Sequence, residues 1–155
     1  HWATILSISE YIETSVEFLK QDLSASNARW KFFATHKPFY SSSPDFNPLE
    51  FPKEHFIDIL EKNGVTMAFF GHVHNYERTH PLIQDEITEG GVVYQVTGGA
   101  GAPFYPEPDQ PEYFSASYIT TNHIIIFHIT PEIMRAEVKA LSGSVIDEYV
   151  VYPRG

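Results

Sequence analysis

Three histidines in this sequence have the spacing and the surroundings of metal ligands. His72 and His74 lie in the stretch FFGHVHNYER, directly after a short apolar run, and His36 follows another apolar run in FATHKPFY. Neutral imidazole is a common protein ligand for zinc, iron, manganese and copper. The three histidines together therefore predict a metal site. A single histidine, taken alone, could equally be a surface loop residue or a hydrogen-bonded core residue.

The spacing of His72 and His74 bears on the number of ions that they would serve. In an extended segment, residues two positions apart project to the same side. Their side chains would then be too far apart to chelate one ion conveniently, but well placed for two ions roughly 3.5–4 Å apart. Gly71, just before them, would let the backbone turn sharply or approach a neighbour closely.

The elements that must position these histidines alternate between strands and helices in the first half of the chain. Thr14 and Glu17 have the spacing of a capping box, and Gly64 is a helix stop signal. The apolar run before Gly71 is typical of a strand buried on both faces. The predicted elements are a strand over Trp2–Ser9, a helix over Thr14–Leu23, a strand over Trp30–Thr35, a helix over Pro52–Asn63 and a strand over Val65–Phe70.

The order strand, helix, strand predicts that the segments 30–35 and 65–70 lie parallel in one sheet. His36 and His72 would then follow the carboxyl ends of these two strands. Ligands bind at this edge of open α/β sheets, because the loops converge there over the strand ends. We therefore expect His36 to lie close to the Gly-His-x-His segment.

The second half of the chain changes character, with consecutive strand patterns and no helix between them. This predicts an antiparallel edge or a second sheet, with LSGS at 141–144 as a hairpin turn. A Gly- and Pro-rich loop at 98–113 could cradle a phosphate or make a tight turn near the histidines. The predicted strands lie at 91–97, 123–129, 133–140 and 145–152. We interpret the whole chain as one α/β unit.

Composition limits the classes of function. The 155 residues carry a formal charge of -10, which argues against broad electrostatic binding to nucleic acid or to anionic membranes. No cysteine is present, so a zinc-thiolate site is excluded, and the apolar runs are too short to span a bilayer. The chain also opens on a strand-like run, whereas natural termini are usually surface segments. We therefore expect the chain to be a piece of something larger.

The two histidine motifs resemble the closing motifs of the calcineurin-like metallophosphoesterases, and most closely those of the purple acid phosphatase branch. The matching residues are Phe33-Ala-Thr-His36 and Gly71-His-Val-His74, followed by Tyr76-Glu77-Arg78. VTGGAG at 96–101 resembles a later glycine-rich loop of that branch. The resemblance runs from Gln21 to the final strands, and it corresponds to the C-terminal half of the family's catalytic domain.

The resemblance implies a fold, a site and an activity. The fold would be α/β, a sandwich of mixed sheets flanked by helices. His36 and His72 would ligate one metal ion and His74 another, the two ions being iron, zinc or manganese in the complete domain. The substrate would be a small phosphate ester, with monoesters hydrolysed by a metal-bound hydroxide. A secreted or extracytoplasmic location is also implied, whereas no catalytic or substrate-binding residue is identified.

The acidic motifs of the family are missing from this sequence. It contains no Asp-x-Gly and no Gly-Asp pair, and we interpret its single Asn-His, at Asn122-His123, as a coincidence. Three imidazoles without a carboxylate are a poor match for two highly charged ions. We therefore expect the N-terminal half of the domain in the same or another chain, and little or no turnover by this chain alone.

Alternatives follow from the same residues. The chain could be a phosphodiesterase of the same superfamily, a non-catalytic module with a vestigial metal site, or a hydrolase that holds one ion with three histidines. Glu77 and Arg78 are expected to brace the histidine loop. The other histidines are expected to be structural, with His55 on the surface and His123 and His128 in a core-like strand; His80 is assigned no role.

Overall fold

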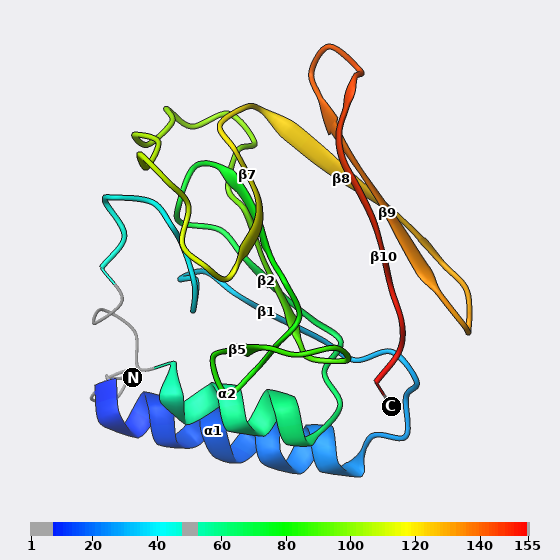
Figure 1. Ribbon diagram of the computed structural model, residues 1–155. Helices are drawn as coiled ribbons and strands as arrows, with labels where there is room; N and C mark the ends of the chain where they lie inside the picture. The colour runs from blue at the N-terminus through cyan, green and yellow to red at the C-terminus, as the bar shows by residue number, and fades with distance from the viewer. Residues whose placement is uncertain (1–7, 48–52, 155) are drawn as a thin grey trace, which may run out of the picture.

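The computed structural model describes residues 8–47 and 53–154, which form three layers. Helices α1 (Ile8–Ala25) and α2 (Glu54–Lys62) cover one face of a five-stranded mixed sheet, and a three-stranded antiparallel sheet lies on the other side (Figure 1). The predicted α/β class with mixed sheets and flanking helices is confirmed. No helix in the described part of the chain is long and apolar enough to cross a membrane.

The larger sheet has the order β1-β2-β6-β3-β7, and the smaller one has the order β10-β9-β8. Strands β1, β2 and β6 are parallel, and β3 runs antiparallel to both β6 and β7. The strands are β1 (Phe32–Thr35), β2 (Met67–Phe70), β3 (Tyr76–Thr79), β4 (Leu82–Ile83), β5 (Glu86–Ile87), β6 (Val93–Thr97), β7 (Ser115–Ile119), β8 (His123–Ile129), β9 (Met134–Ala140) and β10 (Val145–Val151).

The strand predictions for the two histidine-bearing strands are confirmed. Thr35, the last residue of β1, pairs in parallel register with Phe70, the last residue of β2. Strand β2 lies between β1 and β6, and its faces enter two different cores. The two strands therefore end at the same edge of the sheet, which is the arrangement that the candidate site requires.

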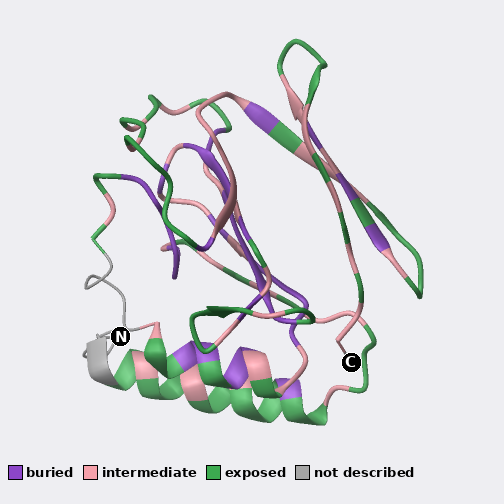
Figure 2. Cartoon of the chain, in the orientation of Figure 1, coloured by how far each residue is buried: buried purple, intermediate pink, exposed green. Residues whose placement is uncertain are grey.

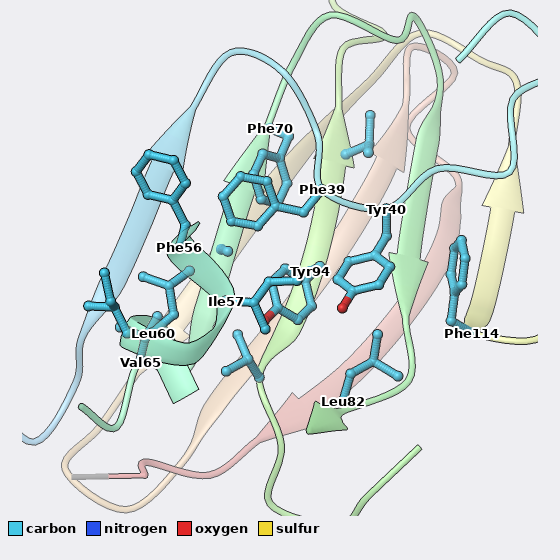
Figure 3. Packing of buried hydrophobic residues seen from close by; sticks show 14 of the residues in the cluster. Phe39, Tyr40, Phe56, Ile57, Leu60, Val65, Phe70, Leu82, Tyr94 and Phe114 are labelled. Carbon is cyan, nitrogen blue, oxygen red and sulfur yellow. The ribbon is translucent and has the colours of Figure 1, made fainter. Parts of the chain in front are cut away.

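Two apolar cores hold the layers together. The larger one joins α2 to the helix-facing side of the sheet, with Phe56 and Leu60 packed near Phe70 and Tyr94 (Figure 3). The smaller one lies between the two sheets and contains Met67, Val93 and Met134. Figure 2 shows that the buried positions of the helices face the sheet while their outer sides are exposed. Burial on both faces explains why β2 is apolar at every position.

The helix predictions are confirmed in kind and corrected in detail. Helix α1 begins at Ile8, so the capping box is wrong: Thr14 lies inside the helix, where its hydroxyl donates to the Glu10 carbonyl oxygen. Ile8 and Ser9, the end of the predicted first strand, are helical, and residues 2–7 lie outside the described residues. Helix α2 ends before Gly64, which has a φ of 71° as expected for a helix stop, and Pro52 is not described.

All four strands predicted in the second half are present, and both expectations for their arrangement hold. Strands β3 and β7 give the large sheet an antiparallel edge, while β8, β9 and β10 form the second sheet. The turn after Ala140 contains Gly143 with a φ of 85°, as the hairpin prediction requires. Strands β3 and β7 themselves were not predicted, because polar residues interrupt both segments and neither forms an apolar run.

Candidate metal centre

The first two candidate ligands meet where β1 and β2 end. The two strands are in parallel register, and the Gly71 amide donates to the His36 carbonyl oxygen at 3.1 Å, extending the pairing by one step. This places His36 beside the Gly71–His72 peptide. The prediction that His36 lies close to the Gly-His-x-His segment is therefore confirmed by the backbone.

The rings of His36 and His72 face each other through ring nitrogens. Nε2 of His36 lies 3.2 Å from Nδ1 of His72, and the rings are nearly perpendicular, at 81°. Two nitrogens that bind one tetrahedral ion at about 2.0–2.1 Å are separated by roughly 3.3 Å. The observed separation therefore matches one edge of a coordination sphere. The His36 side chain is exposed, so an ion has access to it.

The sharp turn at this site falls on a histidine and not on the glycine before it. His72 has a φ of 63°, which is left-handed, whereas Gly71 is absent from the residues with positive φ. A methyl group on Gly71 would meet Nδ1 of His36 at an ordinary 3.5 Å. The expectation that Gly71 makes the turn is therefore wrong, and so is the extended geometry assumed for His72 and His74. Left-handed non-glycine residues are strained and cluster at functional sites.

His74 lies against a different part of the chain. Its Nδ1 lies 2.7 Å from the Pro103 carbonyl oxygen, and its ring stacks on Tyr105 with centroids 4.6 Å apart. Since a carbonyl oxygen only accepts, Nδ1 carries the proton and Nε2 keeps its lone pair. The structure thus brings His36 and His72 together and turns His74 towards the loop after β6. The contribution of Pro103 and Tyr105 was not predicted, because nothing in their local sequence marks them as partners of a distant histidine.

The described residues do not complete a metal site. Within residues 8–47 and 53–154, no three histidine, aspartate or glutamate side chains gather closely enough to hold one ion. The separation of the His36 and His72 ring nitrogens is compatible with two ligands of one ion.

Glu77 and Arg78 brace this region, as predicted, and the structure identifies their partners. The buried Glu77 carboxylate accepts hydrogen bonds from the Ser42 amide and hydroxyl, which ties the loop after His36 to β3. Arg78 donates to Asp147 on β10 at 2.9 Å. These contacts join both histidine-bearing loops to the framework. Neither Ser42 nor Asp147 carried a sequence signal beyond its polarity.

Asp147 accepts hydrogen bonds from two side chains, Tyr76 and Arg78, and these bonds alter its acidity. Burial by itself raises the pKa of this carboxyl, but the hydrogen bonds from Arg78 and Tyr76 outweigh burial and hold the pKa below its usual range. Burial, reinforced by the Asp147 carboxylate, raises the pKa of the Tyr76 hydroxyl far above its usual range. Tyr76 is therefore a neutral donor to Asp147 and not a phenolate available to a metal.

The glycine-rich loop after β6 packs directly on the histidine turn. A methyl group on Gly98 would lie 2.1 Å from the Val73 carbonyl oxygen, so only glycine fits there. The Gly98 amide also donates to the Asn75 carbonyl oxygen at 3.1 Å. This contact matches the expectation of a tight turn near the histidines, whereas the phosphate cradle stays a prediction.

Among the described residues, the other histidines do not join the candidate ligand pair. His55 and His80 are exposed, the first as predicted. His123 is buried, with Nδ1 donating to the Thr121 carbonyl oxygen and Nε2 near the Thr97 hydroxyl. His128 is exposed and so corrects the core prediction, because the alternation of β8 turns it to the outer face of the small sheet.

An apolar groove in the described structure is separate from these histidines. It runs between α1 and β1, and exposed Phe18 and Phe32 give it an apolar wall. Its lining includes none of the three candidate ligands. A hydrolytic site needs polar and titratable groups, so the strand-end histidines are the better candidate.

Comparisons with known proteins identify related sequences. A family profile described as calcineurin-like phosphoesterase matches residues 1–76. The chain is 36% identical over 89 residues to purple acid phosphatase 15 of Arabidopsis thaliana, covering 55% of this chain and 17% of that protein. It is 30% identical over 105 residues to the probable inactive purple acid phosphatase 27 of the same plant, covering 56% and 17%.

A solved structure shares the fold. Purple acid phosphatase PPD1 from yellow lupin (Lupinus luteus) seeds superposes with a TM-score of 0.78 at 24% sequence identity. The superposition covers 88% of this chain and 28% of that one. The chain thus spans less than a third of the solved structure and 17% of both curated relatives.

Proposed function

We infer that the chain belongs to the calcineurin-like phosphoesterase superfamily, in its purple acid phosphatase-like branch, and we propose that it supplies half of a two-metal site for hydrolysis of phosphate monoesters. The single observation that carries this proposal is the 3.2 Å contact between Nε2 of His36 and Nδ1 of His72 at the ends of two parallel strands. Two imidazoles held at the spacing of a coordination edge are well suited to binding one ion.

The proposed ligand assignment uses all three histidines. His36 and His72 bind one ion, and His74 binds the other through Nε2, because its Nδ1 proton is donated to Pro103. Two ions of iron, zinc or manganese would polarise a phosphoryl oxygen and activate a water molecule. The protein's own part is to hold the three imidazoles at the sheet edge and to keep them accessible.

The rest of the site is proposed to lie outside this chain. Hard, highly charged ions need carboxylate ligands, and no aspartate or glutamate among the described residues gathers with the histidines into a ligand set. We propose that the N-terminal half of the domain, in the same or another chain, supplies these ligands. The chain alone is expected to show little or no turnover. We also propose the secreted or extracytoplasmic location that the family resemblance implies.

A non-catalytic role is the second candidate. Three curated relatives of this chain are themselves described as probable inactive purple acid phosphatases. In that case the fold and the bracing contacts would persist while the ligand set would stay incomplete in the full-length protein. The presence of all three histidines favours the catalytic role.

The decisive experiment uses this chain together with the proposed N-terminal half of the domain. It measures hydrolysis of p-nitrophenyl phosphate and the metal content of that protein. His36→Gln, His72→Gln and His74→Gln should each lower activity at least about a hundredfold. His55→Gln changes an exposed histidine on α2 and serves as the matched control, with activity unchanged.

Four results would contradict parts of the proposal. Full activity in the histidine variants would contradict the assignment of His36, His72 and His74 as metal ligands. Absence of bound metal and of turnover in the full-length protein would favour the non-catalytic role. Robust turnover by the isolated chain would show that the site does not need another segment, and preference for a diester substrate would identify a phosphodiesterase.

A further inference from the structure

The loop between β6 and β7 contacts the turn that carries His72 and His74. Both the base and the tip of the loop make this contact. At the base, Gly98 packs on the Val73 carbonyl oxygen, between the two histidines of the motif. At the tip, Pro103 and Tyr105 both contact the His74 ring. A segment held at both ends against the same turn is suited to fixing the orientation of a side chain in that turn.

The two contacts at the tip restrain different degrees of freedom of the imidazole. The Pro103 carbonyl oxygen, at 2.7 Å, requires a proton on Nδ1. The Tyr105 ring, stacked at an interplanar angle of 21°, restricts the plane in which His74 can lie. A flip of the His74 ring would exchange Nδ1 for a carbon and would break the hydrogen bond, while a rotation out of the plane would lose the stacking.

We propose that Tyr105 is a positioning residue for His74, which together with the Pro103 carbonyl holds the imidazole as the Nδ1–H tautomer and presents Nε2 as the ligand atom. This inference rests on the proposed metal site for its purpose, and it adds a residue from a distant loop to that site. Outer contacts of this kind orient metal-binding histidines and raise their basicity as ligands.

Tyr105 does not need its hydroxyl for this role, because the contact is between rings. Tyr105→Phe should therefore preserve the effect, and Tyr105→Ser should remove it. Phe104→Ser is the matched control, since Phe104 is the adjacent aromatic residue, is 43% exposed and belongs to the same loop. Equal behaviour of Phe104→Ser and Tyr105→Ser would mean that loop composition, and not the stacked ring, is responsible.

The experiment reads the tautomer directly. The chain is labelled with ¹⁵N, and two-bond ¹H–¹⁵N correlations of the imidazoles are recorded at a pH where histidines are neutral. In the unsubstituted protein and in Tyr105→Phe, Nδ1 of His74 should carry the proton. In Tyr105→Ser the His74 signals should shift towards a mixture of tautomers, while the Phe104→Ser spectrum should match the unsubstituted one. Urea denaturation confirms that each variant is folded.

Several results would overturn the inference. An unsubstituted protein with the proton on Nε2 of His74 would contradict it whether or not any variant folds. An unchanged tautomer in folded Tyr105→Ser would assign the effect to Pro103 alone. On adding excess Zn²⁺, Nε2 should be perturbed more than Nδ1, and any other pattern contradicts the choice of ligand atom. None of these readouts requires turnover. Failure of this inference can therefore be distinguished from absence of phosphatase activity.

Discussion

Arg78 on β3 and Asp147 on β10 form an ion pair that joins the five-stranded sheet to the three-stranded sheet, with Nε of Arg78 2.9 Å from Oδ2 of Asp147. Both side chains are largely buried, at 17% and 13% exposure. The guanidinium also lies over the Tyr149 ring at 4.5 Å, and Tyr76 donates a further hydrogen bond to Asp147. The segment that carries His72 and His74 leads directly into β3, and this ion pair attaches β3 to the three-stranded sheet.

Removal of the Asp147 charge should destabilise the protein, because it leaves the Arg78 guanidinium buried without its counter-ion. We expect Asp147→Asn to lower the free energy of unfolding by about 2–3 kcal/mol in urea denaturation. The double variant Arg78→Met/Asp147→Leu should recover much of this loss, since it leaves no unpaired charge. A loss in the double variant equal to or larger than that of Asp147→Asn would contradict this account.

The same carboxyl should make stability depend on pH. The pKa of Asp147 is lower in the folded protein than its ordinary value, so folding favours the ionised form. This contribution is fully present above the unfolded-state pKa of about 3.9 and is lost as the pH falls through the lower folded-state pKa. Unfolding free energies measured from about pH 6 down to pH 2 should fall less steeply in Asp147→Asn than in the unsubstituted protein. Identical profiles would show that Asp147 is not held ionised.

The left-handed backbone at His72 should be measurable as strain. An L-residue in this conformation costs roughly 1–2 kcal/mol, and glycine avoids most of that cost. Because His72→Ala and His72→Gly both remove the imidazole, their difference reports the backbone alone. We expect His72→Gly to be more stable than His72→Ala by about 1 kcal/mol in urea denaturation. Higher stability of the alanine variant would mean that residue 72 is not left-handed in solution.

Lys31 should stabilise the ends of both helices. Its ammonium group donates to the Leu23 carbonyl oxygen at 3.2 Å and to the Asn63 carbonyl oxygen at 3.0 Å. These groups belong to the negative C-terminal ends of α1 and α2. We expect Lys31→Met to lower the free energy of unfolding by about 2 kcal/mol. Lys20→Met, an exposed lysine on α1, is the control and should change it by less than about 0.5 kcal/mol.

The contact between Glu77 and Ser42 should couple the loop after His36 to β3. Glu77 accepts from both the amide and the hydroxyl of Ser42, and Ser42 in turn accepts from the Glu112 amide. A double-mutant cycle of Glu77→Gln and Ser42→Ala should give a coupling energy of about 1 kcal/mol. Hydrogen exchange at the Ser42 amide should be faster in Glu77→Gln, and equal exchange rates would argue against the contact.

The sequence was sufficient for some, but not all, of the features that depend on neighbouring residues. Apolar runs before His36 and His72 predicted two buried strands, and their order with a helix between them predicted the parallel pairing that brings both histidines to one edge. The capping box at Thr14 failed because the helix began earlier, so that the same hydroxyl bonds within a turn of the helix. Strand β3 was missed because its buried polar residues do not show apolar alternation.

Other features depended on parts of the chain that are far apart. The sequence by itself determined which side chains could bind a metal and at which strand ends they stand. Only the tertiary structure decided that His72 turns left-handed towards His36, that Tyr105 stacks on His74, and that Asp147 closes the ion pair with Arg78. The physical reason is that a local pattern constrains which face a residue occupies, whereas the packing of sheets and loops sets which distant side chains meet there.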